Sequence, residues 1–448
     1  MNTSGFTVLY VPIGVGTFHM ESARAQFASS AACLRTLAED VVCPDDILLT
    51  TQDLIAYLDR PAPDLIVLQN ITFANSAYAA EVLRRFDAPL VLWALREPVI
   101  DGGRLRLNSL TGAYAAANAA ASYRDDPIEF IYGSPEEPGV REALSTFIDA
   151  AAMKRDLKSL KISAIGQTPQ GFGFGRALDA ELQRVFGVTL EAIEARELIR
   201  DAKALQITDC EAEWSEAFGT LNGLSKMPVK NRDDFVRLYR AYKDYIEANG
   251  IGAVASRCWP DFFTDYGTPV CTVLSLLNAN GITASCETDV YGALSMYIGS
   301  GFTGNPAFFG DPTSLDEAEN TITFWHCGMA ACSLARAEEG AQVGVHPNRR
   351  IGPVMNFGCR ASERAVIFRV GRRADASFRF FIVEGEILDR PRQFEGTSIV
   401  VKTDAPAGQI VEEGIKGGWE PHYAVVYGDA ASRLEALGHM LGVDVYRY

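Results

Sequence analysis

Two acidic residues frame the segment "CETDVYGALSMYIGSGFTGNPAFFGD", which runs from Cys286 to Asp311. Glu287 and Asp311 each follow a short apolar run that is typical of a buried strand. A buried carboxylate is costly without a partner, and two close carboxylates repel each other unless a cation lies between them. Residues 258–331 contain no Lys or Arg. A divalent metal ion is therefore one interpretation; the other is that Glu287 caps a helix and Asp311 starts a loop.

Histidine side chains are the next candidates, because only five are present. His326 ends the strand-like run "NTITFWHCG", and His422 precedes another in "GGWEPHYAVVYGD". Either one could serve as a plain hydrogen-bonding group or as a ligand in a cleft. His19 follows "GVGTF" near the end of the first predicted strand and could touch a ligand, whereas His346 and His439 are predicted to be structural.

Asp289 lies two residues beyond Glu287, just before the helical pattern of "VYGALSMYI". It is expected to cap that helix or to hydrogen-bond Glu287, and not to bind a metal. The glycine patterns "PIGVGTF" and "GFGFGRA" do not complete a dinucleotide-binding fingerprint, so tight turns are the better interpretation. This argues against a nicotinamide-dependent oxidoreductase.

The elements that must position these residues alternate between short apolar runs and longer amphipathic ones. Strands are predicted at residues 6–14, 64–70, 89–95 and 130–133, and helices at residues 23–40 and 76–86. This alternation is typical of βα units around a parallel sheet. A second set begins with "KISAIG" and ends with the strand "ITASC", directly before Glu287. Both carboxylates are thus expected at the ends of strands, where open α/β sheets meet ligands.

After about residue 303 the pattern changes to alternating strands, such as "ERAVIFRVGR" and "SFRFFIVEGEIL", closed by a terminal helix at residues 431–441. The fold class is therefore predicted as α/β: two Rossmann-like α/β domains followed by a C-terminal antiparallel β-rich domain. The predicted boundaries are 1–160, 161–302 and 303–448.

The net charge, the cysteine content and the apolar runs of the chain disfavour several partners and locations. The 448 residues carry a net charge of −16, which disfavours nucleic acid and anionic membranes as partners. The nine cysteines form no C-x-x-C pair, so reduced thiols in a cytoplasmic protein are expected. No basic, apolar signal segment and no apolar run of membrane-spanning length occurs.

Taken together, these motifs resemble the L-fucose isomerase and L-arabinose isomerase superfamily. The most specific match is "CETDVYGAL" with the aspartate of "FFGD"; "WHCG", "GGWEPHYAVVYGD", "GQTPQGF" and the segment from residue 90 to 120 also match, in the family's order. The resemblance spans nearly the whole chain. It implies the three-domain division given above and a metal-dependent aldose–ketose isomerase that works through a cis-enediol intermediate.

The resemblance also implies a set of ligands and a cofactor. Glu287, Asp311 and His422 are expected to hold Mn²⁺, or another divalent cation such as Mg²⁺ or Co²⁺, with His326 as an additional ligand. Glu287 and Asp311 are the expected acid–base pair. The chain is shorter than typical fucose isomerases, so the sugar pocket is expected to differ, and an anionic substrate such as a sulfonated or phosphorylated hexose is an option.

Further residues are candidates for binding the small-molecule sugar. "RCWPDFF" supplies Arg257 and Trp259, although Trp259 could instead pack a loop. Family members are homo-oligomers, so a hexamer or smaller assembly is expected, with His19 and Phe73 reaching a neighbour's pocket. The alternative function is a sugar-binding or regulatory protein on the same fold that has lost turnover.

Overall fold

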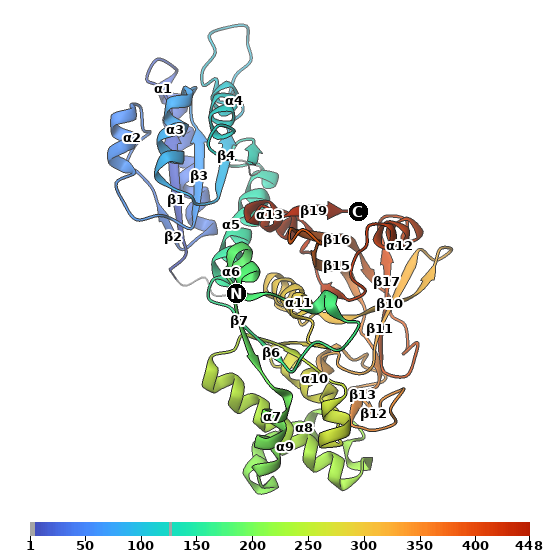
Figure 1. The fold of residues 1–448 in the computed structure, drawn as a ribbon. Coiled ribbons are helices and arrows are strands. Elements are labelled where there is room, and N and C mark those ends of the chain that lie inside the picture. The colour runs from blue at the N-terminus through green and yellow to red at the C-terminus, as the bar shows by residue number, and fades with distance from the viewer. Residues whose placement is uncertain (1–4, 125–127) are drawn as a thin grey trace. The chain divides into compact units, whose positions relative to one another are not determined.

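A computed structural model describes residues 5–124 and 128–448. The chain forms two compact units, Met1–Asp156 with Ala436–Gly442, and Leu157–Glu435 with Val443–Tyr448. The predicted fold class is confirmed: two parallel sheets with helices are followed by a mixed, largely antiparallel sheet (Figure 1). The three-domain division with a boundary at residue 302 stays a prediction.

The first unit is built around a five-stranded parallel sheet in the order β2-β1-β3-β4-β5. Every residue of β3 and β4 is buried, as expected for strands that helices cover on both faces. The strands are β1 (Thr7–Ile13), β2 (Asp40–Val42), β3 (Leu65–Asn70), β4 (Leu90–Ala94) and β5 (Glu129–Tyr132). The helices are α1 (Met20–Leu37), α2 (Thr51–Tyr57), α3 (Ser76–Arg85), α4 (Ser109–Ala120) and α5 (Pro138–Leu157).

The second unit begins with a four-stranded parallel sheet in the order β7-β6-β8-β9. Its strands are β6 (Lys161–Ile165), β7 (Thr189–Ile193), β8 (Ala253–Ser256) and β9 (Thr283–Cys286). The helices that accompany it are α6 (Asp179–Phe186), α7 (Ala195–Ala204), α8 (Glu211–Thr220), α9 (Val229–Asn249), α10 (Cys271–Ala279) and α11 (Val290–Thr303).

An eight-stranded sheet follows in the order β14-β17-β11-β10-β18-β15-β16-β19, with parallel pairing only at β14–β17 and β16–β19 within the part described. Its strands are β10 (Phe308–Asp316), β11 (Thr321–His326), β14 (Phe357–Gly358), β15 (Ser362–Arg372), β16 (Phe378–Ile387), β17 (Thr397–Thr403), β18 (Tyr423–Tyr427) and β19 (Asp444–Arg447). A separate short hairpin pairs β12 (Val343–Gly344) with β13 (Val354–Met355), and the helices are α12 (Ala407–Lys416) and α13 (Ala431–Leu441).

Helix α11 joins the two sheets of the second unit into one core. It packs against β8 and β9 of the parallel sheet and against β15 and β18 of the mixed sheet. Its sequence, "VYGALSMYIGSGFT", contains no charged residue, as a helix buried on all sides requires. Gly299 lies so close to Val426 that a Cβ there would overlap it. The residues just before α11 are therefore fixed relative to both sheets.

Two expectations about elements are wrong. Asp311 does not end a strand, because β10 continues to Asp316 as one arm of a hairpin with β11. The chain also does not close with α13, because β19 follows and pairs with β16. Both missed segments are mostly exposed, so they carry little of the apolar signal that marks a buried strand.

All nine cysteines are free thiols, as predicted. Among the described residues, no helix combines the length and the apolar composition that crossing a membrane would require.

Candidate active site

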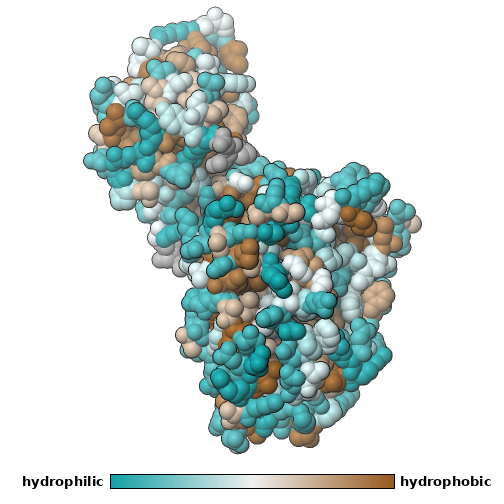
Figure 2. Space-filling model, viewed as in Figure 1, coloured by the Kyte–Doolittle hydropathy of each residue, from teal (hydrophilic) through white to brown (hydrophobic). Residues whose placement is uncertain are grey.

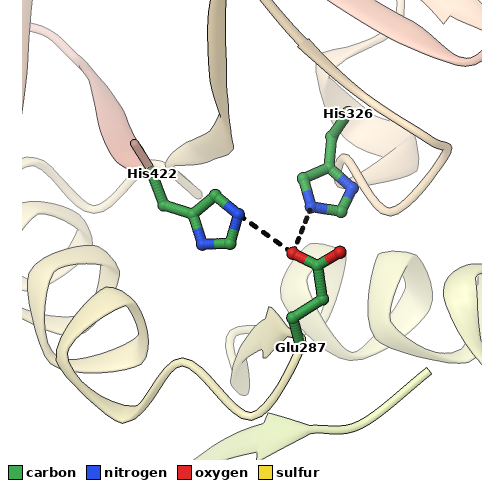
Figure 3. Close-up of side chains that lie close together, drawn as sticks. All are labelled: Glu287, His326 and His422. Carbon is green, nitrogen blue, oxygen red and sulfur yellow. Dashed lines mark ion pairs between the residues drawn. The ribbon is translucent and has the colours of Figure 1, made fainter. Parts of the chain in front are cut away.

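A strained turn between β9 and α11 carries Glu287. Glu287 and Thr288 both adopt left-handed backbone conformations, with φ of 60° and 54°. For residues with a Cβ this conformation costs roughly 1–2 kcal/mol each. Strain of this kind persists only where the surrounding structure imposes it, and such sites are concentrated where a side chain must be aimed. The turn directs the Glu287 carboxylate toward two histidines (Figure 3).

Asp289 holds this turn in place through its hydrogen bonds. One carboxylate oxygen accepts the backbone N–H of Gly292 at 2.8 Å and caps α11, as predicted. The fully buried guanidinium of Arg369, on β15, binds both carboxylate oxygens at 2.7 and 3.1 Å. Burial alone would raise the pKa of Asp289, but Arg369 and His422 outweigh burial and hold it well below its usual range. The Asp289 carboxylate is therefore ionised near neutral pH.

His422 lies between this anion and Glu287. Its Nδ1 is 2.9 Å from Asp289 Oδ2, and because an ionised carboxylate can only accept, Nδ1 carries the proton. Its Nε2 is 2.9 Å from Glu287 Oε2 and 3.3 Å from Asp311 Oδ1. Burial lowers the pKa of His422, but the hydrogen bonds to Asp289 and Glu287 raise it to about 9. A carboxylate that fixes the tautomer in this way leaves Nε2 available as a metal ligand once it is deprotonated.

His326, the last residue of β11, approaches the same carboxylate. Its Nε2 is 3.9 Å from Glu287 Oε2 (Figure 3). Its Nδ1 accepts the backbone N–H of Cys327 at 3.0 Å and is also 3.3 Å from Cys327 Sγ. With the backbone hydrogen bond, the neutral ring has its proton on Nε2. In the other tautomer Nδ1 carries the proton and donates it to the Cys327 sulfur, which leaves a free lone pair on Nε2. His326 can therefore be a proton donor to Glu287 or a ligand.

Asp311 completes the carboxylate pair from within β10, where it is paired with Trp325 of β11. Its side chain is 35% exposed and faces the pocket that also holds Glu287. Burial raises the pKa of Asp311, although the nearby His326 and His422 act against this shift. A carboxylate with a raised pKa is better suited to accept a proton near neutral pH than one in water.

Three of the four predicted ligands form one cluster, and the fourth lies beside it. Donor atoms of Glu287, His326 and His422 all lie within 4.8 Å of one another, and Asp311 is outside that group but in contact with His422. One carboxylate and two imidazoles form a set of oxygen and nitrogen donors that suits a divalent cation of the Mn²⁺ class. The deep burial of both imidazoles and the fixed tautomer of His422 fit such a site.

A pocket of about 240 Å³ opens beside these residues. It is lined by three groups: the carboxylates and histidine just described, a set of apolar or sulfur-containing side chains, and a loop before β13. The lining residues are Pro169, Phe172, Cys258, Trp259, Glu287, Asp311, Trp325, His326, Cys327, His346, Asn348 and Arg349. A pocket lined by a few polar groups and by apolar side chains is typical of small-ligand sites.

The other predicted sugar-binding residues are distributed differently. Trp259 lines the pocket. Arg257 pairs with Asp261 at 3.0 Å, donates to the Trp259 carbonyl at 3.0 Å and is not among the lining residues described. In the first unit, His19 caps α1 by accepting the Ser22 N–H, and Phe73 packs against Phe18 with ring centroids 6.5 Å apart. The roles of these residues in binding sugar remain predictions.

Several residues of the site were missed. Arg369 is 80 positions from Asp289, so no local pattern could connect them. His346 is buried and lines the pocket, although its polar loop indicated only a structural residue. The "GFGFG" turn supplies Phe174, whose ring meets the His422 ring edge-on at 5.0 Å, and Gly175, which packs against Asp289. In the sequence, the close spacing of glycine and phenylalanine indicates only a tight turn at this point.

Comparison with known proteins gives a family. No family model matches the chain. The chain is 58% identical over 445 residues to a sulfoquinovose isomerase of Clostridium sp. (strain MSTE9), covering 99% of this chain and 100% of that protein. It is 37% identical over 452 residues to the sulfoquinovose isomerase of Priestia megaterium, covering 99% of each, and 35% identical over 454 residues to that of Alkalicoccus urumqiensis, covering 98% of each. At these identities over the full length, the chain belongs to the sulfoquinovose isomerase family.

Proposed function

We propose that this protein interconverts sulfoquinovose, an aldohexose with a sulfonate on C6, and the corresponding 2-ketose. The observation that carries the proposal is the 58% identity over 99% of the chain to a protein named sulfoquinovose isomerase. The cluster of carboxylates and imidazoles supports it independently, because aldose–ketose isomerisation needs a positioned acid–base group beside a site that stabilises an oxyanion. The similarity to the fucose and arabinose isomerase superfamily is part of the same proposal.

Glu287, His422 and His326, with Asp311 beside them, are proposed to hold a divalent cation, Mn²⁺ before Mg²⁺ or Co²⁺. The support is the donor set and the hydrogen bond from His422 to Asp289, which presents Nε2 to the site. When bound, such a cation would polarise the sugar carbonyl and offset the negative charge that develops on the substrate oxygens.

The proton transfer is assigned to the two carboxylates. One of them removes the proton from C2 of the open-chain aldose, which leaves a cis-enediol, and the same group returns a proton to C1 while the hydroxyl proton passes from O2 to O1. Asp311 is favoured as the base because it lines the pocket and because burial raises its pKa, which suits a group that accepts a proton near neutral pH. Glu287, 2.9 Å from His422, is then the group that donates and accepts the hydroxyl proton.

Trp259 is proposed to pack against the sugar carbons from the pocket wall, with Arg257 holding the loop that carries it. His19 and Phe73 are proposed to reach a neighbouring subunit's pocket in a homo-oligomer of six or fewer chains. Nine free thiols support a reducing compartment such as the cytoplasm.

Substitution of Glu287 by Gln tests the assignment. Isomerisation of sulfoquinovose, followed by ketose formation, is expected to fall by roughly 10²–10⁴-fold, the scale for loss of a positioned acid–base group. Glu319→Gln removes an exposed carboxylate that pairs with Arg390 and is the matched control, with unchanged activity expected. Near-normal turnover by Glu287→Gln would remove this residue from the mechanism.

The alternative function, a sugar-binding protein without turnover, makes a different prediction. The wild-type protein would bind sulfoquinovose but form no ketose at any divalent cation concentration. Retention of both carboxylates and both histidines in one cluster argues against this alternative, because a protein that only binds sugar needs no acid–base pair.

A further inference from the structure

The pocket beside Glu287 and Asp311 has one basic side chain. Of the residues that line it, Arg349 is the only Lys or Arg in the part of the chain described. It lies in the loop that joins β12 to β13, a short hairpin separate from the turn that carries Glu287 and from β10, which carries Asp311. The pocket therefore combines an acidic wall with a single positive charge from a different element.

The guanidinium of Arg349 is held by aromatic rings and has no acidic partner. Its Cζ is 4.7 Å from the centre of the Trp259 ring and 5.2 Å from that of Phe263, within the range of cation–π attraction. Across residues 5–124 and 128–448, no carboxylate pairs with it and no hydrogen bond uses its side-chain N–H groups. The next residue, Arg350, differs: it pairs with Glu395 at 2.7 Å and does not line the pocket.

The backbone that presents Arg349 is fixed by His346. The Nδ1 of this buried ring accepts the backbone N–H groups of Asn348 and Arg349, at 3.2 and 3.3 Å. The ring itself meets Phe263 edge-on at 5.0 Å. The loop is thus ordered around a buried side chain, so a ligand that binds to Arg349 does not bear the cost of ordering it.

A guanidinium with free donors in a pocket suits an oxyanion, because its planar fork can bind two oxygens at once. A neutral sugar needs no such group, and the acidic wall would repel an anion that had no cation to meet it. A sulfonate carries one negative charge, whereas a phosphate monoester carries about −1.5 to −2 at pH 7. A single Arg among the lining residues matches the single charge of a sulfonate.

We propose that Arg349, supported by Trp259 and by the side-chain amide of Asn348, binds the C6 sulfonate of the substrate and so determines the choice of a sulfonated over an uncharged aldose. This inference rests on the proposed function and adds the group that selects its substrate. Arg349 touches the part of the sugar that does not react, so it is a specificity-determining residue and not an acid–base group.

The test compares wild type, Arg349→Gln, Arg349→Lys and Arg350→Gln on sulfoquinovose and on quinovose, the same sugar without the sulfonate. Arg349→Gln is expected to lower kcat/KM for sulfoquinovose by roughly 10–100-fold, mainly through KM, the scale for loss of hydrogen bonds between charged groups. Proton exchange into quinovose is expected to stay within about threefold, since that sugar has no sulfonate for Arg349 to bind. Arg349→Lys should recover part of the loss, and Arg350→Gln should match wild type on both sugars.

The outcomes separate the two proposals. If wild type forms no ketose from sulfoquinovose, the proposed function fails. If wild type is active and Arg349→Gln keeps the wild-type KM, only the sulfonate site is wrong. Equal losses on both sugars, or a loss of Mn²⁺ affinity, would show a structural role and also overturn the site. If wild type exchanges quinovose too slowly to measure, the test uses sulfoquinovose alone. A raised KM for sulfoquinovose with near-normal kcat and unchanged Mn²⁺ affinity in Arg349→Gln then supports the site. An unchanged KM with a lowered kcat rejects it.

An aldose 6-phosphate is the last arm of the test. Wild type is expected to use it less efficiently than sulfoquinovose, because one arginine leaves part of the phosphate charge unbalanced beside two carboxylates. A preference for the 6-phosphate would contradict the assignment to a sulfonate.

Discussion

At the scale of single residues, the site is a chain of ion pairs and hydrogen bonds. Arg369 binds Asp289, and Asp289 accepts a hydrogen bond from His422 Nδ1 and so orients the ring. The Nε2 of His422 in turn contacts Glu287. Glu287, His326 and His422 could be singled out from sequence because each follows or precedes a short apolar run. Their grouping as ligands follows from the family resemblance and stays a prediction. Arg369 could not, because the absence of Lys and Arg from residues 258–331 says nothing about a cation that a distant strand supplies.

Substitution of Asp289 by Asn tests this chain of interactions. The amide no longer forces the proton onto His422 Nδ1, so Mn²⁺ affinity is expected to fall by roughly 10–100-fold, the usual effect of losing the partner of a metal-binding histidine. The free energy of unfolding should also fall, since Arg369 loses its buried counter-charge. Calorimetric titration with Mn²⁺ and a thermal melt measure the two effects. A less stable variant with unchanged Mn²⁺ affinity would show that Asp289 serves the fold alone.

The raised pKa of His422 predicts how cation binding depends on pH. Without metal, the imidazole stays protonated up to about pH 9, and a cation must displace that proton. Mn²⁺ affinity should therefore rise with pH up to about pH 9, by about tenfold per unit for the proton on His422. The rise should be steeper where His326, whose pKa is raised to about 10, must also lose a proton. Titrations in buffers of different ionisation enthalpy should count about one proton released near pH 7.5 if His422 alone binds the cation, and about two if His326 binds it as well. Affinity that does not change over this range would contradict the assignment of His422 as a ligand.

At the scale of elements, the site depends on a junction between β9 and α11 and on the turn at residues 171–175. The alternation of strands and helices that places Glu287 could be predicted from hydrophobic pattern alone. The length of β10 could not, because five of its residues are exposed and the hairpin is stabilised by backbone pairing with β11. The glycines at 171–175 predict a turn, but the packing of that turn on Asp289 depends on tertiary structure.

Two glycines of that turn make a matched pair. A Cβ on Gly175 would lie 2.8 Å from the Cα of Asp289, closer than side chains approach backbone, so Gly175→Ala must displace the turn that carries Glu287. Sulfoquinovose turnover is expected to fall by at least tenfold, with a loss of roughly 1–3 kcal/mol of stability. Gly173→Ala, where nothing lies within 4 Å, should have near-normal turnover. Equal behaviour of the two variants would remove Gly175 from the support of the site.

At the scale of the whole molecule, the second unit holds the entire cluster of ligands and the pocket, and α11 ties its two sheets together. The fold class could be predicted from the change in pattern near residue 303. The joining of both sheets around one helix could not, because the sequence shows only that α11 is apolar throughout. Figure 2 shows a surface that is mostly hydrophilic with scattered hydrophobic patches.

The first unit has exposed apolar side chains that an assembly would cover. They lie between residues 99 and 114 and include Ile100 at 92% and Tyr114 at 74% exposure. Sedimentation is expected to give a multiple of 48.8 kDa, and Ile100→Asp should shift the protein toward the monomer. Ile415→Asp, at a position 76% exposed in the second unit, is the control. A wild-type monomer at micromolar concentration would contradict the proposed homo-oligomer.

Deuterium incorporation during turnover tests the central claim most directly. The protein is stripped with a chelator, supplied with Mn²⁺ and incubated with sulfoquinovose in D₂O, and the sugar is followed by NMR. The account predicts a 2-ketose with deuterium from solvent at C1, formed only when Mn²⁺ is restored and lost in Glu287→Gln. Ketose formation that is undiminished in the stripped protein, or no ketose with any divalent cation, would contradict it.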